Sequence, residues 1–161
     1  SIVHKKGYFH ATVHIWIVDT SNNILLQKRS IHKDTHPGLW DISCAGHVST
    51  GDSSMEAALR ELHEELGLST DAQELHYLFR NFKRYVSPDG LIQDNEYADV
   101  YFLKVQEKTA FSVDKQEVDE IKFITVEKFE NMVGRKDPQL VPNEAEYRKI
   151  LRFLKLNEEP S

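Results

Sequence analysis

Three glutamates fall within five positions of the segment RELHEELGL, residues 60–68: Glu61, Glu64 and Glu65. If the segment is helical, these side chains lie close together, and like charges three or four residues apart repel by roughly a few tenths of a kcal/mol per pair. Two interpretations are open. In the first, the strip is a solvated helix face on which Arg60 pairs with Glu64. In the second, a cation binds to the carboxylates.

The loop that precedes this segment favours a cation site. It reads AGHVSTGD, residues 45–52, and Gly46 and Gly51 in it allow a backbone carbonyl or a phosphate to come close. Mg²⁺ and Mn²⁺ take oxygen ligands and substrate phosphates. Carboxylates beside such a loop therefore indicate a divalent-metal site that acts on a phosphorylated ligand.

The surrounding sequence predicts the helix that positions the carboxylates. Ser53 is the expected N-cap, with Glu56 three residues on, and Gly67 is well placed to end the helix. An apolar face at helical spacing adjoins the carboxylate strip. Its members are Met55, Ala58, Leu59, Leu62 and Leu66. The helix is expected to pack with one side and to present carboxylates on the next.

The other elements predict an α/β fold. Patterns rich in β-branched and aromatic residues predict strands at 10–19, 24–29, 75–86, 94–105 and 120–127, with a short apolar segment at 41–48. An amphipathic helix is expected at 143–156, with Tyr147, Ile150, Leu151 and Leu154 inward. Strands mixed with two or three helices, and several antiparallel hairpins, are typical of a mixed sheet between helices.

Composition restricts the class of protein. The chain has 161 residues, 40% of them apolar, and no break in composition, so a single domain over residues 1–161 is expected. A net charge of −6 without a long basic run argues against a nucleic acid polymer as partner. No apolar stretch is long enough to span a membrane, and no secretory signal core is found. The single cysteine, Cys44, fits a reducing cytoplasm, which is the expected location.

Residues 46–68, GHVSTGDSSMEAALRELHEELGL, resemble the Nudix box, G-x5-E-x7-R-E-U-x-E-E-x-G-U, in which U is apolar. The residues that match in register are Gly46, Arg60, Glu61, Leu62, Glu64, Glu65, Gly67 and Leu68. Asp52, a shorter carboxylate, stands where the family usually has Glu. The strand pattern on both sides of the box also fits the α/β/α sandwich of these MutT-like hydrolases, so the resemblance covers most of the chain.

The resemblance implies a role for each matching residue. Glu64 and Glu65 would be the main metal ligands, with Glu61 as a further ligand or the residue that handles water. The backbone carbonyl of Ala45 would complete the metal shell, and Arg60 would hold the glutamates by ion pairing. The implied reaction is hydrolysis of a small-molecule diphosphate linked to another moiety, X, with Mg²⁺ or Mn²⁺ as cofactor. In such a site the metal lowers the pKa of bound water and a carboxylate takes the proton.

A narrower resemblance links the chain to the isopentenyl-diphosphate isomerases and their hydrolase-like relatives. The segment LLQKRSIHKDTHPGLWD, residues 25–41, is similar to their basic strand and Pro-Gly-x-Trp loop. Arg29 and Lys33 match diphosphate-binding positions there, and Gly46 would lie against the substrate. Trp40 would either flank the pocket or belong to the core.

Several histidines and acidic residues extend this resemblance. His10 and His47, and approximately His4, match histidines that hold the isomerase metal, so His47 is also expected at the substrate pocket. Asp94 and Glu96 match metal and acid/base positions, which makes Glu96 a candidate ligand or general base. A second, histidine-rich metal site is one alternative; histidines held by backbone partners are the other.

Two features favour a hydrolase over an isomerase. The isomerases have a cysteine directly before the Gly-His pair, where this chain has Ala45; Cys44 is one residue away and should point to the opposite face of a strand. The isomerases also lack the glutamates that this chain has at Glu61 and Glu64. A non-catalytic module that binds diphosphates is a third alternative, although such modules usually lose box glutamates. The identity of X and the oligomeric state stay open; dimers are common in the family, so a homodimer is one candidate assembly.

Overall fold

The structure is a computed structural model that describes residues 9–86, 88–91 and 93–157. Within these residues, seven strands form one mixed sheet: β1 (Phe9–Asp19), β2 (Ile24–Arg29), β3 (Trp40–Asp41), β4 (Cys44–His47), β5 (Leu75–Val86), β6 (Gln93–Val105) and β7 (Val118–Ile124). The helices are α2 (Ser54–Leu66), α3 (Val126–Gly134), α4 (Glu144–Leu156) and a short 3₁₀ helix, η1 (Ala72–Glu74).

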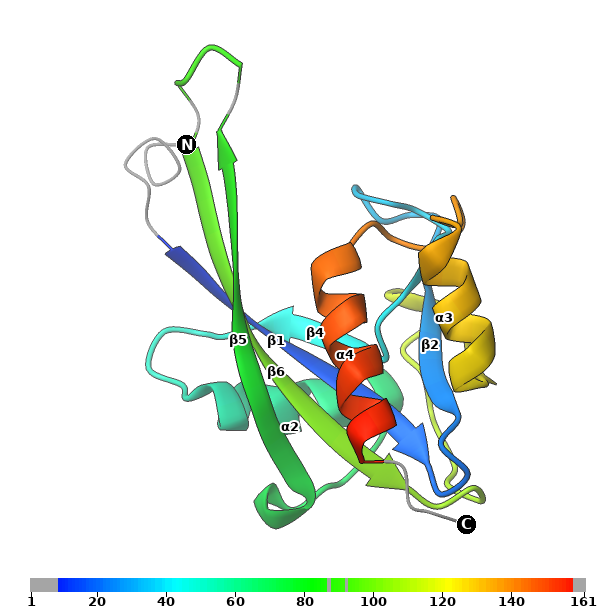
Figure 1. The fold of residues 1–161 in the computed structure, drawn as a ribbon. Helices are drawn as coiled ribbons and strands as arrows, with labels where there is room; N and C mark the ends of the chain where they lie inside the picture. The colour runs from blue at the N-terminus through cyan, green and yellow to red at the C-terminus, as the bar shows by residue number, and fades with distance from the viewer. Residues whose placement is uncertain (1–8, 87, 92, 158–161) are drawn as a thin grey trace.

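The sheet is organised around β1. The strand order is β3-β2-β1-β6-β5, while β4 pairs with β1 and β7 pairs with β2. β1 and β6 run parallel, from Phe9 opposite Asn95 to Asp19 opposite Val105, and the other pairings are antiparallel. β1 therefore connects the long β5–β6 hairpin to the short strand that precedes the carboxylate helix (Figure 1).

Two hydrophobic clusters lie on opposite faces of the sheet, because successive side chains of a strand point to opposite sides. Val13, Ile15 and Ile17 of β1 pack with the buried side of α2. Trp16 and Val18 pack on the other face with α3 and α4. Figure 1 shows α2 on one side of the sheet and α3 and α4 on the other. The predicted α/β fold with a sheet between helices is confirmed.

The helix α2 begins and ends as predicted. The Ser53 hydroxyl accepts a hydrogen bond of 3.1 Å from the Glu56 amide, and Gly67 is left-handed at φ 68°. The end of the helix is covered by the β6–β7 loop, in which the amides of Ser112 and Asp114 donate to the carbonyls of Leu66 and Glu65. Both ends of α2 are thus fixed, which holds its carboxylates at a constant position relative to β4.

The prediction for residues 120–127 is wrong at its end. The strand β7 stops at Ile124, and Thr125 caps the helix α3 by accepting a hydrogen bond from the Lys128 amide. Apolar residues continue across this boundary, so the pattern alone did not separate a strand from the first turn of a helix. In the described part of the chain, none of the helices has the length and apolar character needed to cross a membrane.

Candidate active site

One cavity of about 820 Å³ brings together nearly all the residues that the sequence nominated. The predicted residues that line it are Arg29, Lys33, Ala45, Gly46, His47, Arg60, Glu61, Glu64, Glu65 and Glu96. They come from β2 and its following loop, β4, α2 and β6. The structure therefore brings side chains from these distant segments to one cavity.

Glu65 is the most enclosed of the three helix carboxylates. Its Oε1 lies 3.3 Å from the Cys44 thiol and 3.4 Å from Nε2 of Gln27, both of which can donate to it. Burial raises the pKa of Glu65 to about 7, and the nearby Glu61 carboxylate adds to the rise. The Ala45 backbone donates to this carboxylate as well, yet the three donors together do not offset burial, so the group is electrostatically suited to a cation.

Glu61 lies directly against the glycine loop. A Cβ added to Gly46 would lie 2.2 Å from Cδ of Glu61, so only glycine fits at position 46 without displacing the carboxylate. The pKa of Glu61 is raised, first by burial and then by the Glu64 carboxylate. Glu64 is exposed to the cavity. In the absence of a cation, the Glu64 carboxylate therefore adds to the effect of burial on Glu61.

Arg60 forms its shortest ion pair with Asp52 and a longer one with a helix glutamate. Its Nη1 lies 2.7 Å from Asp52, and its Nη2 donates to the His47 carbonyl at 3.0 Å. The nearest glutamate is Glu61, at 3.9 Å. Arg60 thus joins the start of the box to the end of β4, and the departure from the family pattern at Asp52 keeps a carboxylate in this contact.

Two cations line the cavity across from the helix. Arg29 lies 3.3 Å from Asp41 and donates to the Thr35 carbonyl, while Lys33 forms an ion pair with Glu117. Each cation therefore has a carboxylate partner that can hold it in place between ligands. An incoming phosphate can accept from the remaining donors of either side chain.

Glu96 lies on β6 beside β1, where the Thr12 hydroxyl is 3.4 Å from its Oε1. His10 is its register partner on β1, and the side chain of His47 is exposed. His4 and the side chain of Asp94 lie outside what the structure describes. Among the described residues, no group of three or more His, Cys, Asp or Glu side chains is already gathered tightly enough to hold a metal.

Trp40 is the nominated residue that the structure places elsewhere. Its ring packs on the cluster that includes Trp16 and α3, and Lys122 lies 6.0 Å from the ring centroid. The backbone of Trp40 pairs with Lys28 of β2 and bonds to Gln139 and Val141. Of the two alternatives for Trp40, the core is the one that the packing favours.

The cavity also contains a histidine whose partner the sequence did not reveal. His14 of β1 lies against the carboxylate of Glu146 in α4. The Glu146 side chain is fully buried. Glu146 precedes Ile150 by four positions, so helical spacing alone placed this carboxylate on the inward face. That position is the signal in the sequence for a buried carboxylate, whereas an apolar pattern alone does not include Glu146.

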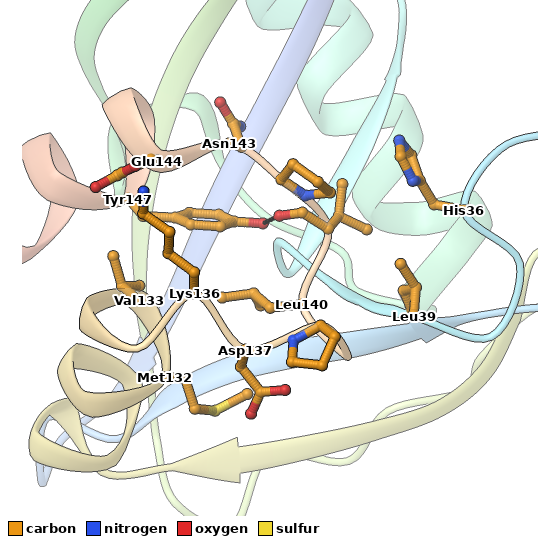
Figure 2. A pocket seen from close by; sticks show the side chains of 13 residues that line it. His36, Leu39, Met132, Val133, Lys136, Asp137, Leu140, Asn143, Glu144 and Tyr147 are labelled. Carbon is orange, nitrogen blue, oxygen red and sulfur yellow. Dashed lines mark hydrogen bonds between the residues drawn. The ribbon is translucent and has the colours of Figure 1, made fainter.

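A second, smaller cavity of about 380 Å³ adjoins the first (Figure 2). His36, Val141 and Asn143 line both cavities. Figure 2 shows Met132 and Tyr147 on one side and His36 and Leu39 on the other. The lining is mainly aliphatic, and the Tyr147 hydroxyl is already bonded to the Val141 carbonyl at 2.6 Å.

The donor set fits a divalent cation. Glu65 has a raised pKa in a largely buried position, Glu61 is pressed against Gly46, and Glu64 remains free to turn toward the cavity. Mg²⁺ keeps several water and substrate ligands and needs few carboxylates. The lack of a preformed cluster among the described side chains is compatible with such a loosely enclosed ion.

Comparisons with known proteins agree with this geometry. The family model described as NUDIX domain matches residues 8–149. The chain is 39% identical over 159 residues to Nudix hydrolase 3 of Arabidopsis thaliana, covering 95% of this chain and 21% of that protein. It is 34% identical over 99 residues to isopentenyl-diphosphate Delta-isomerase of Serratia proteamaculans, covering 62% of this chain and 53% of that protein. The chain thus spans about a fifth of the first relative and about half of the second.

Solved structures show the same fold. A MutT protein from Methanosarcina mazei matches with a TM-score of 0.67 at 21% identity, covering 94% of this chain and 96% of that one. A bifunctional NMN adenylyltransferase/ADP ribose pyrophosphatase from Francisella tularensis, solved with AMP and a Mn ion, matches with a TM-score of 0.62 at 16% identity, covering 93% and 42%. With the box, the sandwich and the family model in agreement, the chain belongs to the Nudix family.

Proposed function

We propose that this protein is a divalent-metal-dependent hydrolase that cleaves the diphosphate of a small molecule linked to a moiety X. The observation that carries the proposal is Glu65, a partly buried carboxylate on the cavity whose pKa is raised to about 7 even though a thiol, an amide and the Ala45 backbone donate to it. A bound cation would stabilise the ionised form of such a carboxylate strongly, because burial otherwise disfavours its charge. Residues 1–161 are proposed to act as a single Nudix domain.

The metal would be Mg²⁺ or Mn²⁺, held by Glu61, Glu64, Glu65 and the Ala45 carbonyl, with Glu96 as a further candidate ligand. When bound, the ion would neutralise diphosphate charge and lower the pKa of a water molecule. The neighbour from Francisella tularensis, which contains a Mn ion, supports this choice by its shared fold.

The protein's own side chains supply the remaining functions. Arg29 and Lys33 line the cavity across from the glutamates and would bind the phosphate oxygens. Glu96 or Glu61 would accept the proton of the attacking water, since both are half-buried carboxylates that face the same cavity. Arg60 would act as a positioning residue, because its bonds to Asp52 and the His47 carbonyl fix the start of the box.

An isomerase is the alternative, and one observation opposes it. Ala45 lies at the position of the isomerase cysteine, whereas Cys44 points to the other face and is packed in the cluster under α2. The thiol is fully buried, and burial raises its pKa well above the ordinary value, with Glu65 adding to the rise. A thiol in this environment is a poor acid or nucleophile.

The adjoining cavity is the proposed place for part of X. It opens beside His36 and Asn143, residues that also line the main cavity. Its aliphatic walls favour an X with an apolar portion over one that requires hydrogen bonds throughout.

The decisive experiment is a substrate screen with product analysis. Nucleoside triphosphates, sugar nucleotides, dinucleotide cofactors and prenyl diphosphates are incubated with Mg²⁺ or Mn²⁺, and the release of phosphate or diphosphate is measured. The proposal expects release from at least one class and its loss on adding EDTA. Isomerisation of isopentenyl diphosphate without release, or hydrolysis that EDTA does not affect, would contradict it.

A further inference from the structure

The side chain of His14 lines the main cavity and also contacts the buried carboxylate of Glu146 in the helix α4. Nδ1 of His14 lies 2.8 Å and 3.0 Å from the two oxygens of Glu146. His14 lines the cavity and its side chain is only 11% exposed. The ring is therefore held firmly at one edge while the other edge, carrying Nε2, remains for a group in the cavity.

Glu146 is a negatively charged anchor. Burial works to raise its pKa, but hydrogen bonds from His14, Trp16 and Asn81 outweigh burial and lower it. Nε1 of Trp16 donates at 2.9 Å and Nδ2 of Asn81 at 3.0 Å. An ionised carboxylate only accepts hydrogen bonds, so Nδ1 of His14 must carry a hydrogen.

His14 lies on the cavity wall next to the proposed metal site. His14 is the register partner of Ala45, whose carbonyl is a proposed ligand, and Arg29 and Lys33 lie on the same cavity. With Glu146 as counter-charge, the ring can carry hydrogens on both nitrogens beside an anion. The bond to Glu146 also fixes the ring, so little conformational freedom is lost on binding.

We infer that His14 is a further substrate-binding residue, which donates from Nε2 to a non-bridging phosphate oxygen of the diphosphate while Glu146 positions its ring. The inference rests on the proposed function and adds a phosphate contact from β1. Glu146 is a positioning residue, since it reaches the cavity only through His14.

Steady-state kinetics with matched variants test the inference. His14→Gln should raise KM about tenfold or more with kcat changed less than about threefold, because a contact made equally in the ground and transition states appears in KM. Glu146→Gln should act in the same direction, and the double variant should be no worse than His14→Gln alone, since one residue acts through the other. Additive effects would overturn the positioning role.

Two controls separate binding from a structural effect. Asn81→Ala removes another donor to Glu146 and leaves the His14 contact, so KM should stay within about twofold if His14 itself binds substrate. His76→Gln changes an exposed histidine on β5 and should have no effect. An equal rise in KM for Asn81→Ala and His14→Gln would mean that the network serves only the fold.

A binding measurement keeps the inference distinct from the proposed function. The protein labelled with ¹⁵N in its histidines is titrated with methylenediphosphonate and Mg²⁺, and the His14 signals are assigned with the His14→Gln variant. A shift of the Nε2 signal supports the contact even if no hydrolysed substrate is found, which would be a failure of the proposed function alone. An unchanged Nε2 signal, whether or not the analogue binds elsewhere, overturns the inference.

Discussion

Two glutamates, the partly buried Glu65 and the fully buried Glu146, lie on helices packed against opposite faces of the sheet, and their pKa values are shifted in opposite directions. Glu65 of α2 has a thiol and an amide at 3.3 Å and 3.4 Å, and burial raises its pKa to about 7. Glu146 of α4 is fully buried, yet its pKa is lowered by His14, Trp16 and Asn81. Burial alone therefore does not set the charge of a carboxylate; the strength of the hydrogen bonds that it accepts and the charges beside it also decide.

The difference distinguishes a carboxylate whose charge needs an added cation, Glu65, from one whose charge is already compensated by neighbouring side chains, Glu146. Glu146 has donors from two strands and carries its charge without further help. The donors to Glu65 do not offset its burial, and Glu61 lies beside it, so an added cation is the partner that would compensate its charge. This contrast predicts opposite responses to pH and to substitution by the uncharged isostere.

The largest expected effect is on activity. Glu65→Gln removes the charge from the proposed metal site with little change of shape, and hydrolysis should fall at least about a hundredfold, which corresponds to roughly 2.7 kcal/mol of transition-state stabilisation. The rate is measured with the best substrate from the screen at saturating Mg²⁺. A variant as active as the parent would remove Glu65 from the site.

The next effect is on metal-free stability. The unfolded chain loses the Glu65 proton near its ordinary pKa of 4.5, whereas the folded protein keeps it to about pH 7. The stability contributed by this group is therefore fully present below pH 4.5 and is lost as the pH rises through 7. At roughly 1.4 kcal/mol per pKa unit, the loss is about 3 kcal/mol.

Urea denaturation in EDTA at pH 5 and at pH 8 measures this loss. Glu65→Gln should be more stable than the parent at pH 8 and similar to it at pH 5, because the amide has no charge to bury. Mg²⁺ should stabilise the parent at pH 8 and have little effect on the variant. A stability difference that does not change with pH would show that Glu65 is not strained by burial.

Glu146→Gln should have the opposite sign. Weakening the bonds to three donors should lower the free energy of unfolding at pH 7 by roughly 1–3 kcal/mol. The lowered pKa means that this stability is present above the ordinary pKa and is lost as the pH falls through the folded value, so parent and variant should converge in acid. If the variant were more stable than the parent at pH 7, the charge of Glu146 would destabilise the fold, as is expected for Glu65, and the contrast between the two residues would be wrong.

The smallest effects are expected at the edges of the Glu65 site. Glu64→Gln changes an exposed carboxylate and should shift the metal-free unfolding free energy by about 0.5 kcal/mol or less, even though it should impair catalysis. Cys44→Ala removes a weak thiol donor from Glu65 and should leave the rate within about threefold of the parent. Loss of the main activity in Cys44→Ala would reopen the isomerase alternative.

By itself, the sequence determined the parts of this protein that depend on local spacing. The box, the capping at Ser53 and Gly67, the two long strands and the inward face of the last helix follow from periodicity and from residues that few conformations tolerate. Ten of the eleven proposed site residues line one cavity. Those of the box follow from fixed offsets on a helix and in its preceding loop, whereas Arg29, Lys33 and Glu96 came from the resemblance to the isomerases.

Only the tertiary structure decided the contacts between distant segments. It decided that Trp40 packs against the core cluster, that Arg60 pairs with Asp52 and not with Glu64, and that the end of a predicted strand is the first turn of α3. It also placed His14 and Glu146, 132 residues apart, within 2.8 Å of each other. Spacing along the chain carries no information on such pairs, because the sheet and the helix that bring them together must first pack.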